Sequence, residues 1–193
     1  MAENDMSAAE LALQKLIAGN KAFVANGTNL ADISSARTTE VARNGQTPYA
    51  VVVTCSDSRV PPEHIFSAGV GDLFVVRTAG NVIGDFERGS IEYAVEQLGV
   101  PLVVIMGHSQ CGAVASALAG RASGYLDTVV GEIQSGITGA ASEQEAILSN
   151  VAHSQHCVMQ SEAVRSLVGA GRLRVMGAEY DLQSGQVSFL QED

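Results

Sequence analysis

The sequence predicts an α/β fold: a mostly parallel central sheet flanked by helices, with an N-terminal helical arm and a C-terminal hairpin. First, apolar runs suited to buried strands, at 49–55, 72–78 and 101–107, are separated by segments of helical periodicity. Second, two extended segments near the end, 172–181 and 186–190, are joined by the turn-forming sequence LQSG. Together these observations indicate parallel strands connected by helices, followed by a hairpin.

The helices are predicted from their caps and apolar stripes. Ser7 and Glu10 fit a capping box at the start of the first helix, and Gly19 fits its end. A second helix is expected at 89–99 and a third at 109–120, each following a strand.

Two stretches carry weaker helical signals. Residues 26–46 are polar and rich in turn residues, and residues 120–145 are rich in Gly, Ser and Ala. We expect the second stretch to form a loop leading into a helix. Since no linker or repeat divides the 193 residues, we expect a single domain over 1–193, with 1–45 as its N-terminal helical arm.

The composition excludes several classes of protein. The formal net charge of −10, with no basic cluster, argues against binding to nucleic acid or an anionic membrane. The acidic start lacks the basic and apolar regions of a signal peptide, so we expect a cytoplasmic protein. Three cysteines are too few for a disulfide scaffold, which leaves metal binding or catalysis as reasons for an unusual cysteine position.

Chemically distinctive residues follow two of the predicted strands. Cys55 ends the first strand, while His108 and Cys111 follow the third. Sites in open parallel sheets form beyond the carboxyl ends of the strands, so these segments can meet. Within a first helical turn, His108 and Cys111 would share a face. Two thiolates and one imidazole suit zinc with an open fourth position, as in catalytic zinc sites.

Asp57 and Arg59 continue the pattern after Cys55. In an extended chain, Asp57 points the same way as Cys55, so its carboxylate could take the fourth zinc position or accept a hydrogen bond there. Arg59 could bind that carboxylate with both arms of its guanidinium and keep it ionised. The pair would then gate the open coordination site.

On these motifs the chain resembles the β-class carbonic anhydrases. The sequence CSDSRVPP is similar to the family's Cys-x-Asp-x-Arg signature, and GHSQCGAV to its His-x-x-Cys signature. The intervening segments, including GDLFVVRTAGNVI, also resemble the family, as do the opening ALQKLIAGNKAFVANG and the closing GAEYDLQSGQVSFL. The similarity extends over nearly the whole chain.

The resemblance implies reversible hydration of carbon dioxide to bicarbonate and a proton, by attack of zinc-bound hydroxide. It implies one Zn²⁺ per subunit and a homodimer or dimer of dimers whose active sites are lined by both subunits. The residues that it implies are the ligands Cys55, His108 and Cys111, the catalytic dyad Asp57 and Arg59, and the substrate-binding residues Gln46, Phe74, Tyr93 and Gly112.

The resemblance also bears on the resting state. Some family members lock Asp57's counterpart onto zinc, using a second bicarbonate pocket marked by a tryptophan three positions before the first cysteine. Val52 occupies that position here, and the chain has no tryptophan, although Arg77 falls where another member of that pocket would lie. We therefore expect the permanently open type, with water on zinc at rest.

A second group of possible ligands lies near the C-terminal end of the chain. His153, His156 and Cys157 occur in a predicted helix, on the side opposite its apolar stripe, and His153 and Cys157 have i,i+4 spacing. No further ligand is evident nearby in the sequence. We expect a solvated or interface face with two histidines and a spare thiol, and not a metal site.

Two rival functions remain. A hydrolase of carbonyl sulfide or carbon disulfide could use the same zinc ligands, because both molecules are linear analogues of carbon dioxide. The second rival is a regulatory protein that uses zinc or a thiol without catalysis. Such a protein would have no need of the Asp57 and Arg59 gate.

Overall fold

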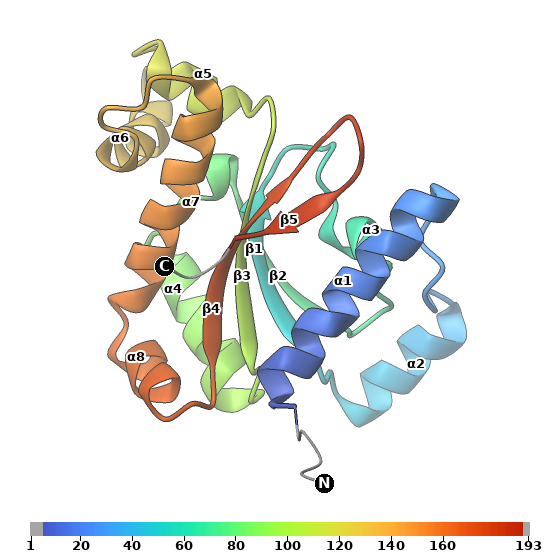
Figure 1. The fold of residues 1–193 in the computed structure, drawn as a ribbon. Helices are drawn as coiled ribbons and strands as arrows, with labels where there is room; N and C mark the ends of the chain where they lie inside the picture. Colours follow the sequence, from blue (N-terminus) through green and yellow to red (C-terminus); the bar gives the residue numbers. More distant parts are fainter. Residues whose placement is uncertain (1–5, 191–193) are drawn as a thin grey trace, which may run out of the picture.

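The computed structural model describes residues 6–190, in which five strands form one sheet between layers of helices (Figure 1). The strands are β1 (Ala50–Cys55), β2 (Leu73–Thr78), β3 (Leu102–His108), β4 (Arg174–Tyr180) and β5 (Val187–Phe189). Their order is β2-β1-β3-β4-β5, with β1 to β4 parallel and β5 antiparallel to β4. The predicted α/β class, mostly parallel sheet and terminal hairpin are confirmed.

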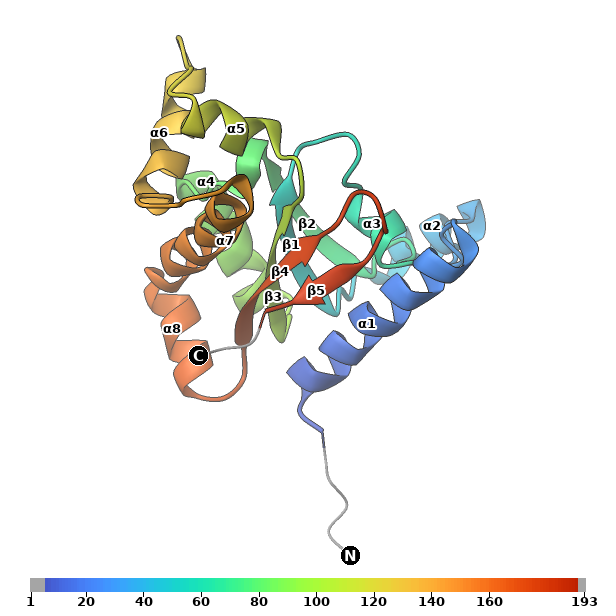
Figure 2. The same cartoon turned by 45° about the horizontal axis from the view of Figure 1, so that its top comes forward.

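Helices cover both faces of the sheet. They are α1 (Ala8–Asn26), α2 (Ser35–Asn44), α3 (Pro62–Ile65), α4 (Asp85–Glu92), α5 (Gly112–Leu118), α6 (Leu126–Gly136), α7 (Glu143–Met159) and α8 (Glu162–Gly169), with short turns η1 (Ala79–Asn81) and η2 (Tyr93–Gln97). The first three lie on one side, and α4 to α8 lie on the other (Figures 1 and 2). Among the described residues, no helix is both long and apolar enough to cross a membrane.

The valines of β1 explain why this strand is central. Side chains alternate along a strand, so Val51 and Val53 pack toward α4, α7 and α8, whereas Val52 packs toward α1 and α3. All three are fully buried. A strand buried on both faces needs apolar residues at every position, which is why it reads as a continuous valine run.

The first helix begins as predicted but ends later. Ser7 is its N-cap, with the Glu10 N–H donating to Ser7 Oγ at 3.2 Å. The expected end at Gly19 is wrong, because the helix continues to the C-cap Gly27. A Cβ at Gly19 would overlap the carbonyl oxygen of Phe66, so glycine here permits close packing of α1 on α3.

The weakly patterned stretches contain more helix than predicted. Helix α2 forms within 26–46, capped by Ser34, although none of its residues is buried. Helix α6 forms within 120–145, where a loop was expected, and it buries Val130 and Ile133. Helix α2 has a cap but no buried apolar stripe, whereas α6 has a stripe of Val129, Val130 and Ile133 that predicts a helix and was overlooked.

Candidate metal centre

Three soft or borderline donors meet at the carboxyl end of the parallel sheet. Cys55 is the last residue of β1, His108 is the last residue of the neighbouring β3, and Cys111 is the N-cap of α5. All three are buried, and one ligand atom from each lies within 4.8 Å of the others. The adjacent positions of β1 and β3 in the sheet thus bring together segments that are far apart in the sequence.

The expected shared helical turn of His108 and Cys111 is wrong. His108 belongs to the strand, and the chain reaches Cys111 through a tight loop in which Gln110 is left-handed, with φ 55°. The hairpin holds this loop in place: the Ser109 N–H donates to Tyr180 O at 3.0 Å, and the Leu182 N–H donates to Ser109 Oγ at 2.9 Å. The donors converge because of this loop, and not because of helical spacing.

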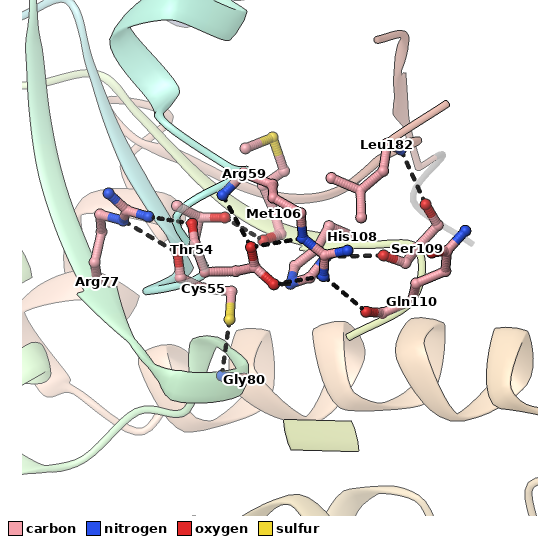
Figure 3. A network of polar contacts seen from close by, with 11 residues as sticks. Thr54, Cys55, Arg59, Arg77, Gly80, Met106, His108, Ser109, Gln110 and Leu182 are labelled. Atoms are coloured by element: carbon pink, nitrogen blue, oxygen red, sulfur yellow. Dashed lines mark hydrogen bonds and ion pairs between the residues drawn. The ribbon is translucent and has the colours of Figure 1, made fainter. Parts of the chain in front are cut away.

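The ring of His108 is oriented for metal binding. Its Nδ1 donates to the carbonyl oxygen of Ser109 at 2.9 Å, which places the proton on Nδ1 (Figure 3). Its Nε2 is buried and has no hydrogen-bond partner among the described residues. An unpartnered buried nitrogen is costly unless something binds it, and a metal ion would satisfy it.

The pKa values of the two cysteines shift in opposite directions. A hydrogen bond from the Cys111 thiol, with another from the Gly80 N–H, lowers the pKa of Cys55 to about 4, although burial opposes this. The same bond to Cys55, together with burial, raises the pKa of Cys111.

This donor set fits zinc. Zinc prefers cysteine sulfur and histidine nitrogen in tetrahedral geometry, and three protein ligands leave one position for water or substrate. The unpartnered Nε2 of His108 and the preformed thiolate of Cys55 are both features that such an ion would use. We conclude that Cys55, His108 and Cys111 could hold one Zn²⁺.

Asp57 and Arg59 form a paired gate beside these donors. Asp57 Oδ2 lies 3.9 Å from His108 Nε2, and its side chain is mostly buried. The hydrogen-bonded guanidinium of Arg59 holds the pKa of the Asp57 carboxyl far below its usual range. The carboxylate is therefore ionised next to the possible metal position while being held by its arginine.

Arg77 has a structural role that sequence reasoning missed. Its Nε donates to the Cys55 carbonyl oxygen at 3.1 Å, and its Nη2 donates to the Asp57 carbonyl oxygen at 2.6 Å (Figure 3). The guanidinium of Arg77 thus holds the main chain in place on both sides of Ser56. No sequence pattern predicts this role, because Arg77 contacts backbone atoms at the end of another strand.

The turn η1 donates a hydrogen bond to the sulfur of Cys55, and the sequence analysis did not predict this contact. The Gly80 N–H donates to Cys55 Sγ at 3.2 Å (Figure 3), while Asn150 Nδ2 of α7 donates to Gly80 O at 2.8 Å. Gly80 has φ 66°, and a Cβ there would lie 2.6 Å from Ile133 Cδ1. The turn needs glycine at this point, both for its left-handed backbone and for its packing.

The predicted substrate-binding residues do not gather within one chain. Gly112 directly follows Cys111 at the start of α5 and is near the donors. Phe74 pairs with Val51 in the sheet, four residues before Cys55, which corresponds to about 13 Å along the strand. The ring of Tyr93 lies 6.2 Å from that of Phe74.

Gln46 is farther still from the donors. It precedes the first residue of β1, and so lies at the opposite end of the strand from Cys55. Its side chain is exposed. Within a single chain, Gln46, Phe74 and Tyr93 therefore lie away from the three donors.

The fold and the three donors define an α/β protein with a candidate metal site, of three protein ligands, at the carboxyl ends of its parallel strands. The sequence profile of the carbonic anhydrase family matches residues 50–187. Carbonic anhydrase 2 of Mycobacterium tuberculosis is 40% identical over 153 residues, covering 74% of each chain. A carbonic anhydrase of Mycolicibacterium smegmatis is 40% identical over 158 residues, covering 75% of each chain.

Solved structures agree with the sequence relatives. A β-carbonic anhydrase of Aspergillus fumigatus superposes with a TM-score of 0.70 at 30% identity, covering 92% of this chain and 90% of that one. A tetrameric β-carbonic anhydrase of Sordaria macrospora gives a TM-score of 0.71 at 28% identity, covering 94% of both chains. The chain belongs to the β-class carbonic anhydrase family, as its sequence predicts.

Proposed function

We propose that this protein catalyses the reversible hydration of carbon dioxide to bicarbonate and a proton, with Zn²⁺ held by Cys55, His108 and Cys111. The observation that carries the proposal is the position of the Asp57 and Arg59 pair beside an open three-donor site. A closed structural site would need a fourth ligand and no gate. Membership of the carbonic anhydrase family supports the choice of reaction.

The residues of the chain prepare the site for this chemistry. Zinc, when bound there, lowers the pKa of a water molecule so that hydroxide is available near neutral pH. Asp57 is ionised and so can only accept a hydrogen bond, which orients the attacking oxygen. Arg59 keeps Asp57 in that role by engaging both of its carboxylate oxygens.

The hydrogen bonds from Arg59 to Asp57 support a resting state in which the fourth zinc position is open. A carboxylate that accepts from Arg59 through both oxygens would have to give up charge-assisted hydrogen bonds in order to bind zinc. We therefore propose that the fourth position is available to water at rest. Val52, fully buried among the residues packed under α1, occupies the position where a tryptophan marks the second bicarbonate pocket of other family members.

We further propose a homodimer or dimer of dimers with active sites lined by both subunits. Gln46, Phe74 and Tyr93 lie too far from their own chain's donors, so they would serve the site of a second subunit. Exposed apolar side chains support such contact: Phe86 is 89% exposed and Tyr93 50%. The tetrameric relatives from Sordaria macrospora are consistent with this assembly.

Residues 1–45 would contribute to the same interface as an arm. Helix α2 has no buried residue, and the segment before it carries Leu30 and Ile33, which are 61% and 60% exposed. Apolar residues so exposed on an outlying segment are well placed to pack on another chain.

The proposal is tested by stopped-flow measurement of carbon dioxide hydration with a pH indicator. Fully zinc-loaded protein should turn over carbon dioxide across about pH 7 to 9, and metal-free protein should not. Carbonyl sulfide and carbon disulfide are assayed in parallel at equal concentration. Faster turnover of either would reassign the substrate, and no turnover of any of the three would favour a regulatory protein.

A further inference from the structure

A second group of metal-binding side chains lies between α6 and α7, away from the sheet edge. Glu132 comes from α6, while His153 and Cys157 come from α7. One ligand atom from each lies within 4.8 Å of the others. We propose that these three residues form a second site for a divalent cation of the zinc type, independent of the first and of the proposed function.

The contacts within the group are specific. His153 Nε2 lies 2.8 Å from Glu132 Oε1, and Cys157 Sγ lies 3.5 Å from the same oxygen. Cys157 Sγ also lies 3.6 Å from His153 Nε2. Each atom therefore contacts both of the others, so that the three form a closed triangle.

The triangle fits a metal better than a proton relay. In a nucleophile, base and carboxylate relay, the histidine uses one ring nitrogen toward the thiol and the other toward the carboxylate. Here the single Nε2 faces both groups. Three donors converging from one side on one point are what a tetrahedral ion needs, with its fourth position left to water.

The helices are built for this convergence. His153 and Cys157 are one helical turn apart, so they lie on the same face of α7. Glu132 and Gly136 have the same spacing on α6, and a Cβ at Gly136 would come within 2.4 Å of the Cβ of His153. Glycine thus lets α6 approach α7 closely enough for Glu132 to reach the two α7 donors.

This geometry corrects the expectation from the sequence. Cys157 was expected on a solvated or interface face, but it is 6% exposed and packs within the core cluster on this side of the sheet. The third donor, Glu132, lies in a stretch expected to be a loop. Only the packing of α6 over α7 brings it to the cysteine and histidine.

The site is accessible and its charge is suitable. The side chains of His153 and Glu132 are 21% and 37% exposed, so an ion can reach them. Burial, with the Glu132 charge, raises the pKa of Cys157, while the nearby Arg88 charge lowers it, so the net direction favours the protonated thiol. On binding, a sulfur–metal bond forms and this proton passes to solvent. Glutamate and thiolate together then balance the charge of a divalent ion.

The test uses the full chain and counts bound metal. Protein dialysed against Zn²⁺ and then against buffer should carry about one zinc more per chain than Cys157→Ser or Glu132→Gln, measured by mass spectrometry. His156→Gln is the matched control, because His156 is an exposed histidine on the same helix. It should keep the metal content of the unmodified protein.

Two further readouts separate a metal site from a simple ion pair. Co²⁺ added to protein that carries one zinc per chain should produce a thiolate-to-cobalt absorption band that Cys157→Ser lacks. A second equivalent of Zn²⁺, added to protein that already carries one zinc per chain, should raise the thermal unfolding temperature of the protein and of His156→Gln, but not that of Glu132→Gln. Carbon dioxide hydration should be unchanged in all three variants. Equal zinc content in the protein and in Cys157→Ser, with no cobalt band, would overturn the proposal.

Discussion

Arg59 engages both carboxylate oxygens of Asp57, with its Nε 2.9 Å from Oδ1 and its Nη2 2.7 Å from Oδ2. The Arg59 N–H donates to the same Oδ1 at 2.9 Å, and Nη2 also donates to the Gln110 carbonyl at 3.1 Å. The arginine therefore joins the segment after β1 to the loop between His108 and Cys111. It fixes the gate relative to all three donors.

Arg59→Ala should retain zinc but lose most of its carbon dioxide hydration. Without the guanidinium, Asp57 is free to move onto the open position, since its Oδ2 is already 3.9 Å from His108 Nε2. We expect turnover to fall by about 100-fold or more, the usual cost of a lost electrostatic contact at a reaction centre. Turnover is measured by stopped flow and zinc by mass spectrometry on the same preparation.

The matched control for this variant is Arg121→Ala, an exposed arginine outside the site. It should keep both zinc and turnover. Near-normal turnover of Arg59→Ala would contradict the gate, whereas loss of zinc would instead assign Arg59 a role in metal retention.

Arg77→Lys should weaken zinc binding even though it preserves the charge. Only a guanidinium can donate to the Cys55 and Asp57 carbonyl oxygens at once with fixed geometry. Contacts that orient ligands are commonly worth about 10- to 100-fold in metal affinity. Competition with a chromophoric chelator measures this affinity. An affinity equal to that of the unmodified protein would mean that Arg77 does not position the ligands.

Much of the fold and part of the site could be predicted because their signals are local. The valine run of β1 is apolar because both faces of the strand are buried, and Cys55 follows it directly. His108 likewise ends β3. Because β1 and β3 are neighbours in the sheet, their carboxyl ends lie side by side. The proximity of Cys55 and His108 could therefore be predicted without knowing the loop structures.

Other features depend on tertiary contacts that no sequence window contains. The left-handed Gln110, and not a helical turn, brings Cys111 near His108. Glu132 reaches Cys157 only because α6 packs on α7, a contact between residues 25 positions apart in the sequence. The substrate roles of Gln46 and Tyr93 stay predictions, because they depend on a second chain.

Gly80→Ala should destabilise the protein and weaken its zinc binding. A left-handed alanine costs about 1–2 kcal/mol, and crowding against Ile133 adds about 1–3 kcal/mol. Movement of the turn would also displace the N–H that donates to Cys55 Sγ. Urea unfolding and chelator competition measure the two effects.

Gly131→Ala provides the comparison, because Gly131 lies within α6 and a Cβ there would meet no atom within 4 Å. It should stabilise the helix by about 0.5–1 kcal/mol. A Gly80→Ala protein as stable as the original would contradict the structural need for glycine in the turn.

Phe86→Asp should dissociate the proposed oligomer and reduce turnover. Phe86 is 89% exposed on α4, the helix that leads into Tyr93, so a charge there would be buried unpaired in a subunit interface. Light scattering coupled to size exclusion measures the mass. Tyr125→Asp replaces an aromatic residue that is 97% exposed elsewhere, and it should leave the mass unchanged. An intact oligomer in Phe86→Asp would exclude this face from the interface.

Tyr49→Phe should reduce the loss of stability at alkaline pH. Burial, with the nearby Asp72 charge, raises the pKa of Tyr49 above its usual value of about 10. The folded protein therefore holds this proton more tightly than the unfolded chain does. The stability from this difference is fully present below about pH 10 and is lost as the pH rises toward the folded-state pKa, with a slope approaching about 1.4 kcal/mol per pH unit.

The free energy of unfolding, measured in urea between about pH 8 and 11, should fall less steeply for Tyr49→Phe than for the unmodified protein. Tyr125→Phe serves as the control, because Tyr125 is 97% exposed and its ring is solvated in both states. It should follow the unmodified protein throughout. If Tyr49→Phe follows the same curve, the phenol of Tyr49 titrates alike in the folded and unfolded chains, and burial beside Asp72 does not disfavour its ionisation.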